Sequence, residues 1–306
     1  MRAPLLCSLV LVVASCEGSP PGPGPAPLKE PPAARLSALD SETPVARARR
    51  GIEQVEGGAG DWKLFSVGAD SSVLYGRLVP APGHAAPEYR LGHLASNGAR
   101  LSLPDALVTD AIALPNGGVA RVSSGRLLIA DRAVASDVLP GLAVSPDGRW
   151  LAFASGPEPE SELFRVSLQG AGAPVALTAD GAAATLPHFS PDGASIGYVS
   201  NVTGLPSLWI MNADGSGKRQ LTNAGLLGDR AEDALRALPA AEGTHAPVWR
   251  ASTISYFDGA RVRAVASDTG ASLWQVDGGR AVWGLAGQLV VELSDGSVAR
   301  VEGAAP

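Results

Sequence analysis

The sequence has few of the residues on which most catalytic and polyanion-binding sites depend. Its 306 residues contain 2 cysteines and 4 histidines, and 24 lysines plus arginines stand against 30 aspartates plus glutamates, for a net charge of −6. The lysines are Lys29, Lys63 and Lys218, and the one dense basic group is Arg47, Arg49 and Arg50. Nucleic acid binding requires a larger surface that neutralises phosphates, so no nucleic acid partner is expected.

The two cysteines, Cys7 and Cys16, both fall in the first residues of the chain. A single Arg2 precedes an apolar stretch over residues 5–13, and the small residues Ala14 and Ser15 stand directly before Cys16. This pattern resembles a bacterial lipobox, and an apolar stretch of that length is too short to span a bilayer. The resemblance implies a signal peptide over residues 1–15 and lipidation of Cys16. The alternative is an ordinary secretory signal cut nearby. A chain cut before Cys16 keeps no cysteine for a disulfide, a thiol nucleophile or a metal.

After the cysteine the chain has almost no large apolar residues. Residues 17–32 read EGSPPGPGPAPLKEPP, a composition that favours extended polyproline II at about 3.1 Å per residue and hence a reach of about 50 Å. Residues 33–50 are polar enough to continue a linker that contains a helical turn. We therefore assign residues 16–50 to a disordered, lipidated tether and residues 51–306 to one folded domain.

The body of the chain has 37 glycines, 25 prolines and no long apolar helical pattern, which favours many short strands joined by turns. A repeat supports this all-β interpretation. The segment from Leu142 reads LAVSPDGRWLAFAS, ELFRVSLQG and PVALT, and the segment from Pro187 reads PHFSPDGASIGYVS, SLWIMNADG and KRQLT. The two segments are copies of one unit.

Each copy is predicted to be a sheet of four antiparallel strands. Its first turn is built from residues that favour a tight reversal, because proline fixes φ, serine and aspartate bond nearby N–H groups, and glycine accepts positive φ. These structural turn residues are Ser145, Pro146, Asp147 and Gly148 in one copy, and Ser190, Pro191, Asp192 and Gly193 in the other. Such a sheet cannot bury both faces alone, so copies are expected to stack radially into a β-propeller.

Weaker copies on both sides of this pair give six four-stranded blades. The four blades that lack SPDG are recognised by strand pattern, including WKLFSV, SVLYGRL, EYRLGHL and ARLSL in the first. The last blade offers three strands, so we predict that residues 52–55, IEQV, supply its outer strand and close the ring. One insertion, DRAEDALRALPAAEG, predicts a short helix that Asp229 caps and Pro239 ends.

The sequences SPDGRWLAFAS and FSPDGASIGYVS, with LWIMNADGSGKRQLT, resemble the repeats of TolB-like six-bladed propellers, the WD40-like PD repeat family. The resemblance is strong over residues 142–222 and implies the fold. The amino-terminal α/β domain of the periplasmic TolB protein has no counterpart, so the resemblance does not extend to a role in the Tol machinery.

No residue pattern predicts catalysis or a bound cofactor. The chain lacks a G-x-S-x-G elbow, and its histidines lack the spacing of HExxH. The sequence around Gly215 and Lys218 lacks most of a phosphate loop, and Asn212, Asp214 and Ser216 lack the bidentate glutamate of a calcium loop, so both are interpreted as a hairpin turn. We expect no enzyme and no metal.

The predicted function is that of an envelope lipoprotein whose propeller binds or scaffolds a protein or other ligand. Membrane contact is through the lipid on Cys16. In the Gram-negative lipoproteins that this leader resembles, aspartate after the lipid-bearing cysteine commonly retains the protein at the inner membrane, so the resemblance with Glu17 at that position implies the outer membrane, facing the periplasm. The alternative is a metal-dependent propeller hydrolase of the lactonase or phytase type with its site in the central channel.

Overall fold

Antiparallel sheets make up nearly all of the regular structure. The computed structural model describes residues 30–39, 44–56, 62–67, 72–80, 87–101, 103, 105–157, 160–170, 172–222, 247–258, 261–285, 288–295 and 297–302. Within it, Pro31–Pro306 forms one unit by its internal contacts. The lipobox, Cys16 and the predicted helix at Asp229 lie outside the described residues.

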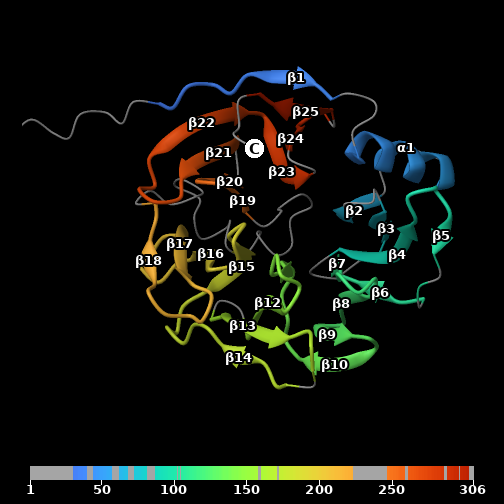
Figure 1. The fold of residues 1–306 in the computed structure, drawn as a ribbon, viewed down its shortest axis with the longest axis horizontal. Coiled ribbons are helices and arrows are strands. Elements are labelled where there is room, and N and C mark those ends of the chain that lie inside the picture. The colour runs from blue at the N-terminus through green and yellow to red at the C-terminus, as the bar shows by residue number, and fades with distance from the viewer. Residues whose placement is uncertain are drawn as a thin grey trace, which may run out of the picture. The chain divides into compact units, whose positions relative to one another are not determined.

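Six sheets stand around a ring, and the prediction of a six-bladed propeller is confirmed (Figure 1). Blades 1 and 2 comprise β2 (Trp62–Val67), β3 (Val73–Val79), β4 (Glu88–Leu94) and β5 (Arg100–Leu101), with β6 (Leu107–Val108) also on β4, then β7 (Asp110–Ala113), β8 (Val119–Ser123), β9 (Arg126–Ile129) and β10 (Arg132–Ala135). Blades 3 and 4 comprise β11 (Ala143–Val144), β12 (Trp150–Ser155), β13 (Glu162–Ser167) and β14 (Val175–Ala176), then β15 (Ala184–Phe189), β16 (Ser195–Ser200), β17 (Ser207–Asn212) and β18 (Arg219–Gln220). Blades 5 and 6 comprise β19 (Val248–Arg250), β20 (Thr253–Phe257), β21 (Arg261–Ala266) and β22 (Ser272–Asp277), then β23 (Gly279–Leu285), β24 (Gln288–Leu293), β25 (Val298–Val301) and β1 (Leu36–Ala38).

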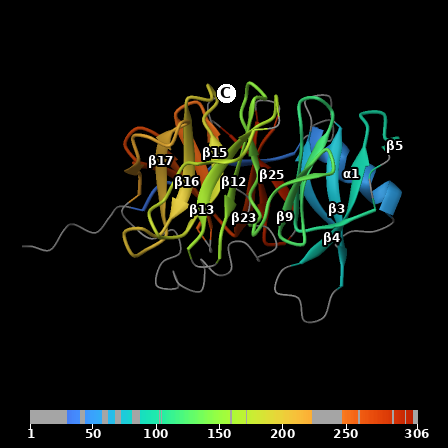
Figure 2. The same cartoon turned by 90° about the horizontal axis from the view of Figure 1, so that it is seen from below.

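The first strands of the blades lie innermost, and the side view shows the strands running between the two faces of the ring (Figure 2). β15 contacts both β11 and β19, the first strands of its neighbours. The core is divided among the blade interfaces. Phe153 of blade 3 belongs to the apolar cluster shared with blade 2, and Tyr198 of blade 4 belongs to the cluster shared with blade 3. A further cluster lies between blades 4 and 5, so blades 3 and 4 bury both faces, as amphipathic sheets must in water.

The ring closes through the amino-terminal end of the unit, but the predicted closing segment is wrong. β1 pairs with β25 in the register Leu36↔Val301, Ser37↔Arg300 and Ala38↔Ala299. Residues 52–55 instead lie in α1 (Pro44–Glu56). The tether assigned to residues 16–50 is corrected by the same observation, because its last part supplies both the outer strand of blade 6 and most of this helix.

α1 packs against blade 1 because its apolar residues repeat at helical spacing (Figure 1). Ala48 and Ile52 are buried, and Val55 packs at the edge of the same cluster. Glu56, at the end of the helix, accepts a hydrogen bond of 2.6 Å from the Tyr75 hydroxyl and pairs with Arg100 at 2.8 Å. Burial, followed by the bond to Glu56, raises the pKa of Tyr75 to about 12. These contacts attach the helix to the first blade.

Candidate functional site

The two SPDG turns have the same hydrogen bonds in both copies. The Ser190 hydroxyl donates to Asp192 at 2.5 Å and accepts from the Ser195 N–H at 2.9 Å, and the Ser145 hydroxyl repeats both bonds with Asp147 at 2.5 Å and Trp150 at 3.0 Å. The serine hydroxyls lower the pKa of both aspartates. Since both carboxylates serve the turn itself, the turns are structural.

The turn glycines also lie at blade interfaces. Gly148, at φ +69°, lies against Pro115 of blade 2, and Gly193, at φ +72°, lies against Pro146 of blade 3. Pro115 belongs to the LPNG sequence that replaces SPDG in blade 2. Successive turns therefore stack along one face of the ring, which gives the motif a role in packing as well as in reversal.

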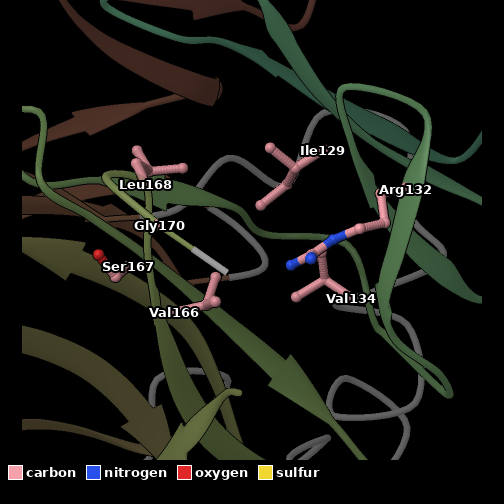
Figure 3. A pocket seen from close by; sticks show the side chains of 7 residues that line it. All are labelled: Ile129, Arg132, Val134, Val166, Ser167, Leu168 and Gly170. Carbon is pink, nitrogen blue, oxygen red and sulfur yellow. The ribbon is translucent and has the colours of Figure 1, made fainter. Parts of the chain in front are cut away.

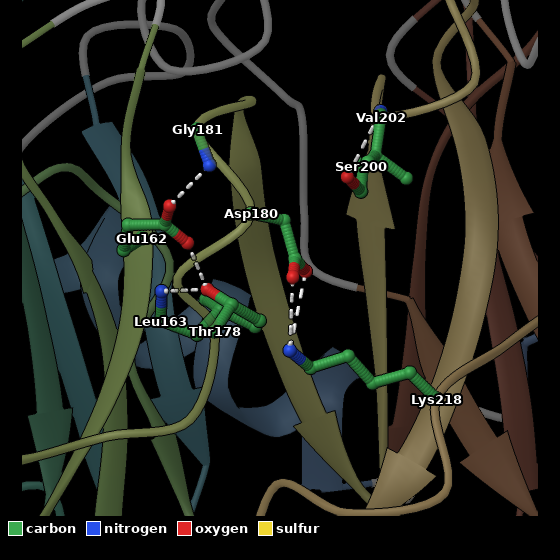
Figure 4. A network of polar contacts seen from close by, with 8 residues as sticks. All are labelled: Glu162, Leu163, Thr178, Asp180, Gly181, Ser200, Val202 and Lys218. Atoms are coloured by element: carbon green, nitrogen blue, oxygen red, sulfur yellow. Dashed lines mark hydrogen bonds and ion pairs between the residues drawn. The ribbon is translucent and has the colours of Figure 1, made fainter.

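A second polar network lies where the chain passes from blade 3 to blade 4 (Figure 4). Thr178, the threonine that ends the first repeat, accepts the Leu163 N–H at 2.8 Å and donates to Glu162, whose other oxygen accepts the Gly181 N–H at 2.9 Å. Lys218 pairs with Asp180 at 3.2 Å. Both Glu162 oxygens have partners in the fold, so this network holds the start of β13 to the segment that follows β14 and is structural. In blade 4 the Thr222 hydroxyl accepts the equivalent bond from the Leu208 N–H at 3.1 Å.

The histidines form no common site in the part of the chain that is described. His188, on β15, is half-buried and its side chain bonds the backbone of Trp249 on the next blade. Burial lowers its pKa from 6.5 to about 4. His84 and His245 lie outside the described residues. Among those described, no group of three or more His, Cys, Asp or Glu side chains is arranged to hold a metal ion.

A pocket of about 270 Å³ opens between the outer parts of blades 2 and 3 (Figure 3). Ile129 and Val134 form its blade 2 wall, and Val166 and Leu168 form its blade 3 wall. Ser167, Gly170 and Arg132 complete the lining. Figure 3 shows the Arg132 side chain extending between Ile129 and Val134 toward the blade 3 wall. The pocket thus combines apolar walls with one cationic group.

The hairpin that presents Arg132 has an unusual backbone. Arg132 pairs with Ile129 across a two-residue turn in which Ala130 and Asp131 both have positive φ, +48° and +62°. Such a turn matches strand twist but normally contains glycine or asparagine. Asp131 forms an ion pair of 2.6 Å with Arg121. Sequence reasoning did not identify this pocket, since its walls come from different blades.

Comparisons with known proteins agree on the architecture. A TolB from Agrobacterium tumefaciens superposes with a TM-score of 0.50 at 17% identity, covering 78% of this chain and 88% of that one. The fold is that of a TolB-like propeller. A gluconolactonase from Xanthomonas campestris superposes with a TM-score of 0.50 at 15% identity, covering 79% of this chain and 86% of that one. At these identities each likeness shows the fold alone.

Sequence comparison finds a curated relative for only part of this chain. A protein named tricorn protease homolog 2, from Streptomyces coelicolor, is 42% identical over 71 residues, which is 23% of this chain and 6% of that protein. No family model matches. The helical structure that is described lacks the length and hydropathy of a transmembrane helix.

Proposed function

We propose that this chain is a lipid-anchored envelope protein whose TolB-like propeller acts as a non-catalytic binding module. The observation that favours binding is the pocket between blades 2 and 3, which offers apolar walls and a guanidinium on a rigid ring. Small-ligand sites combine apolar surface with a few placed polar groups in this way. The lipobox resemblance at Cys16 supports the anchor, and Glu17 favours the outer membrane, facing the periplasm.

Binding is tested by affinity capture with the full, lipidated chain from detergent-solubilised envelopes of the bacterium that makes it. A partner that is enriched over a capture with unrelated lipoprotein, and that competes with added untagged chain, is the expected result. Absence of any competed partner, peptide or small molecule in the eluate contradicts the proposal.

The anchor is tested by incorporation of radiolabelled palmitate. Label is expected in the wild-type chain and absent from Cys16→Ser, with Cys7→Ser as the matched control that keeps its label after processing. Label that persists in Cys16→Ser contradicts the anchor.

The competing hypothesis of a metal-dependent lactonase or phytase gives a different result in the same preparation. A hydrolase retains a divalent metal in stoichiometric amount and hydrolyses a lactone or a phosphate ester, losing activity with a chelator. We expect neither retained metal nor hydrolysis. Either one, at stoichiometric metal content, replaces the binding proposal.

A further inference from the structure

The pocket between blades 2 and 3 has room for one aliphatic residue. Its volume is about 270 Å³, the liquid volume of roughly nine water molecules at about 30 Å³ each. A single residue with its terminal carboxylate fits within that space. Ile129, Val134, Val166 and Leu168 line this space together with Ser167 and Arg132, so the pocket suits a ligand that joins an aliphatic group to a polar one.

Arg132 is the charged side chain at this pocket, and it selects for an anion. The residue is exposed and makes no hydrogen bond or ion pair in the part of the chain that the structure describes. The adjacent carboxylate, Asp131, is already paired with Arg121. A guanidinium binds a carboxylate through two parallel N–H donors, which a neutral amide cannot match.

The edge of blade 2 extends the pocket outward. β10 is the outermost strand of its sheet and pairs only with β9 among the described strands. Unpaired backbone groups on such an edge accept an extended peptide. β10 pairs regularly with β9 at Arg132 and Ala133, and the register shifts before Ala135, so we expect an added peptide to pair with the end of the strand that begins at Arg132, beside the pocket.

We propose that this pocket binds the carboxyl-terminal residue of an extended peptide, placing its aliphatic side chain between blades 2 and 3 and its terminal carboxylate on Arg132. This inference rests on the proposed binding function and names the chemistry of the ligand. The residues before the terminal one run along the Arg132 end of β10.

The test uses the full chain in detergent and a fluorescein-labelled glycine-serine pentapeptide that ends in leucine, as the free acid and as the amide. Fluorescence anisotropy is expected to give saturable binding of the acid and about tenfold weaker binding of the amide. Arg132→Gln is expected to weaken binding of the peptide acid about tenfold and to leave binding of the amide unchanged. Arg126→Gln, which removes the same charge from an exposed residue on β9 outside the pocket lining, stays within twofold of wild type.

A second pair of variants fills space without removing contacts. A Cβ at Gly170 would meet no atom within 4 Å, and neither would one at Gly172, but only Gly170 lines the pocket. Gly170→Leu is expected to lower the affinity for the acid more than tenfold, and Gly172→Leu is expected to leave it unchanged. Both variants keep the wild-type unfolding midpoint, so a loss in Gly170→Leu alone reports occlusion.

Three results overturn the inference: no binding of the acid at millimolar peptide, equal affinity for acid and amide, or hexanoate binding as tightly as the peptide acid. The last result assigns the pocket to a free aliphatic acid. If a captured envelope partner binds wild type and Gly170→Leu equally, this pocket is not its site, although the chain remains a binding module. If both the peptide binding and the affinity capture fail, the proposed function is contradicted as well.

Discussion

At the scale of single residues, the serine of the SPDG turn is a buried hydroxyl that makes two hydrogen bonds. Ser190 is buried, at 4% exposure, and serves both Asp192 and the Ser195 N–H. We expect Ser190→Ala to lower the free energy of unfolding by about 1 to 2 kcal/mol, because the half-buried N–H of Ser195 and the Asp192 carboxylate both lose their partner. Ser216→Ala is the matched control, since Ser216 makes the same bond to Asp214 at 2.6 Å but is exposed. Urea unfolding checks both, and equal losses contradict the argument.

His188 makes stability depend on pH. Its pKa is lowered to about 4 in the folded chain from an ordinary 6.5, so the unfolded chain takes up the proton first as the pH falls. The stabilisation is complete above pH 6.5 and is lost between pH 6.5 and 4, by at most about 1.4 kcal/mol per pH unit. Urea unfolding at pH 7, 5.5 and 4.5 should show a shallower decline for His188→Gln, which keeps an N–H donor for Trp249. Parallel declines assign the pH dependence to other groups.

At the scale of the element, the turn between β17 and β18 of blade 4 is fitted to the neighbouring blade. Gly215, at φ +91°, would place a Cβ 2.8 Å from the backbone oxygen of Leu177 in the preceding blade, whereas Gly204, at φ +97°, meets no atom within 4 Å. We expect Gly204→Ala to cost about 1 kcal/mol from backbone strain alone. Gly215→Ala should cost a further 1 to 3 kcal/mol, roughly, from the clash. Thermal unfolding of the two variants separates these contributions, and identical midpoints contradict the inter-blade contact.

The strands of the clear repeat could be predicted from sequence, and the helix could not. β12 and β16 alternate large and small residues between two tight turns, so local pattern alone places them. Residues 52–55 offered too short a window, since Ile52 and Val55 suit a strand or a helix. Extending the pattern to Ala48 gives the spacing of one helical face, which packs on blade 1. β1 was missed because backbone bonds hold this short edge strand, and Leu36 is exposed at 38%.

At the scale of the whole ring, the blade order was predictable and the pocket was not. A repeat of 45 residues determines which blades are neighbours, and that determines which faces are buried. The pocket depends instead on how the outer strands of blade 2 face the end of β13 in blade 3. Ile129 and Val134 belong to a blade without the SPDG turn, and Arg132 is exposed on its outer strand. No sequence motif predicts which side chains of the two blades meet there, so the pocket is identified only in the folded structure.

The closure of the ring by β1 gives the last prediction. Glu302 N–H donates to the Arg35 carbonyl at 2.9 Å, so the alternation of the antiparallel ladder makes Ser37 and Arg300 the next bonded pair, while the Leu36 N–H points away from β25. Ser37→Pro removes a ladder bond and should lower the free energy of unfolding by about 2 to 3 kcal/mol, because blade 6 then loses its outer strand. Leu36→Pro should cost less than about 1 kcal/mol, since proline is tolerated where the N–H faces outward. Urea unfolding compares them, and hydrogen exchange should show faster exchange in β25 for Ser37→Pro alone. Equal losses for the two prolines would mean that the ring does not depend on this strand.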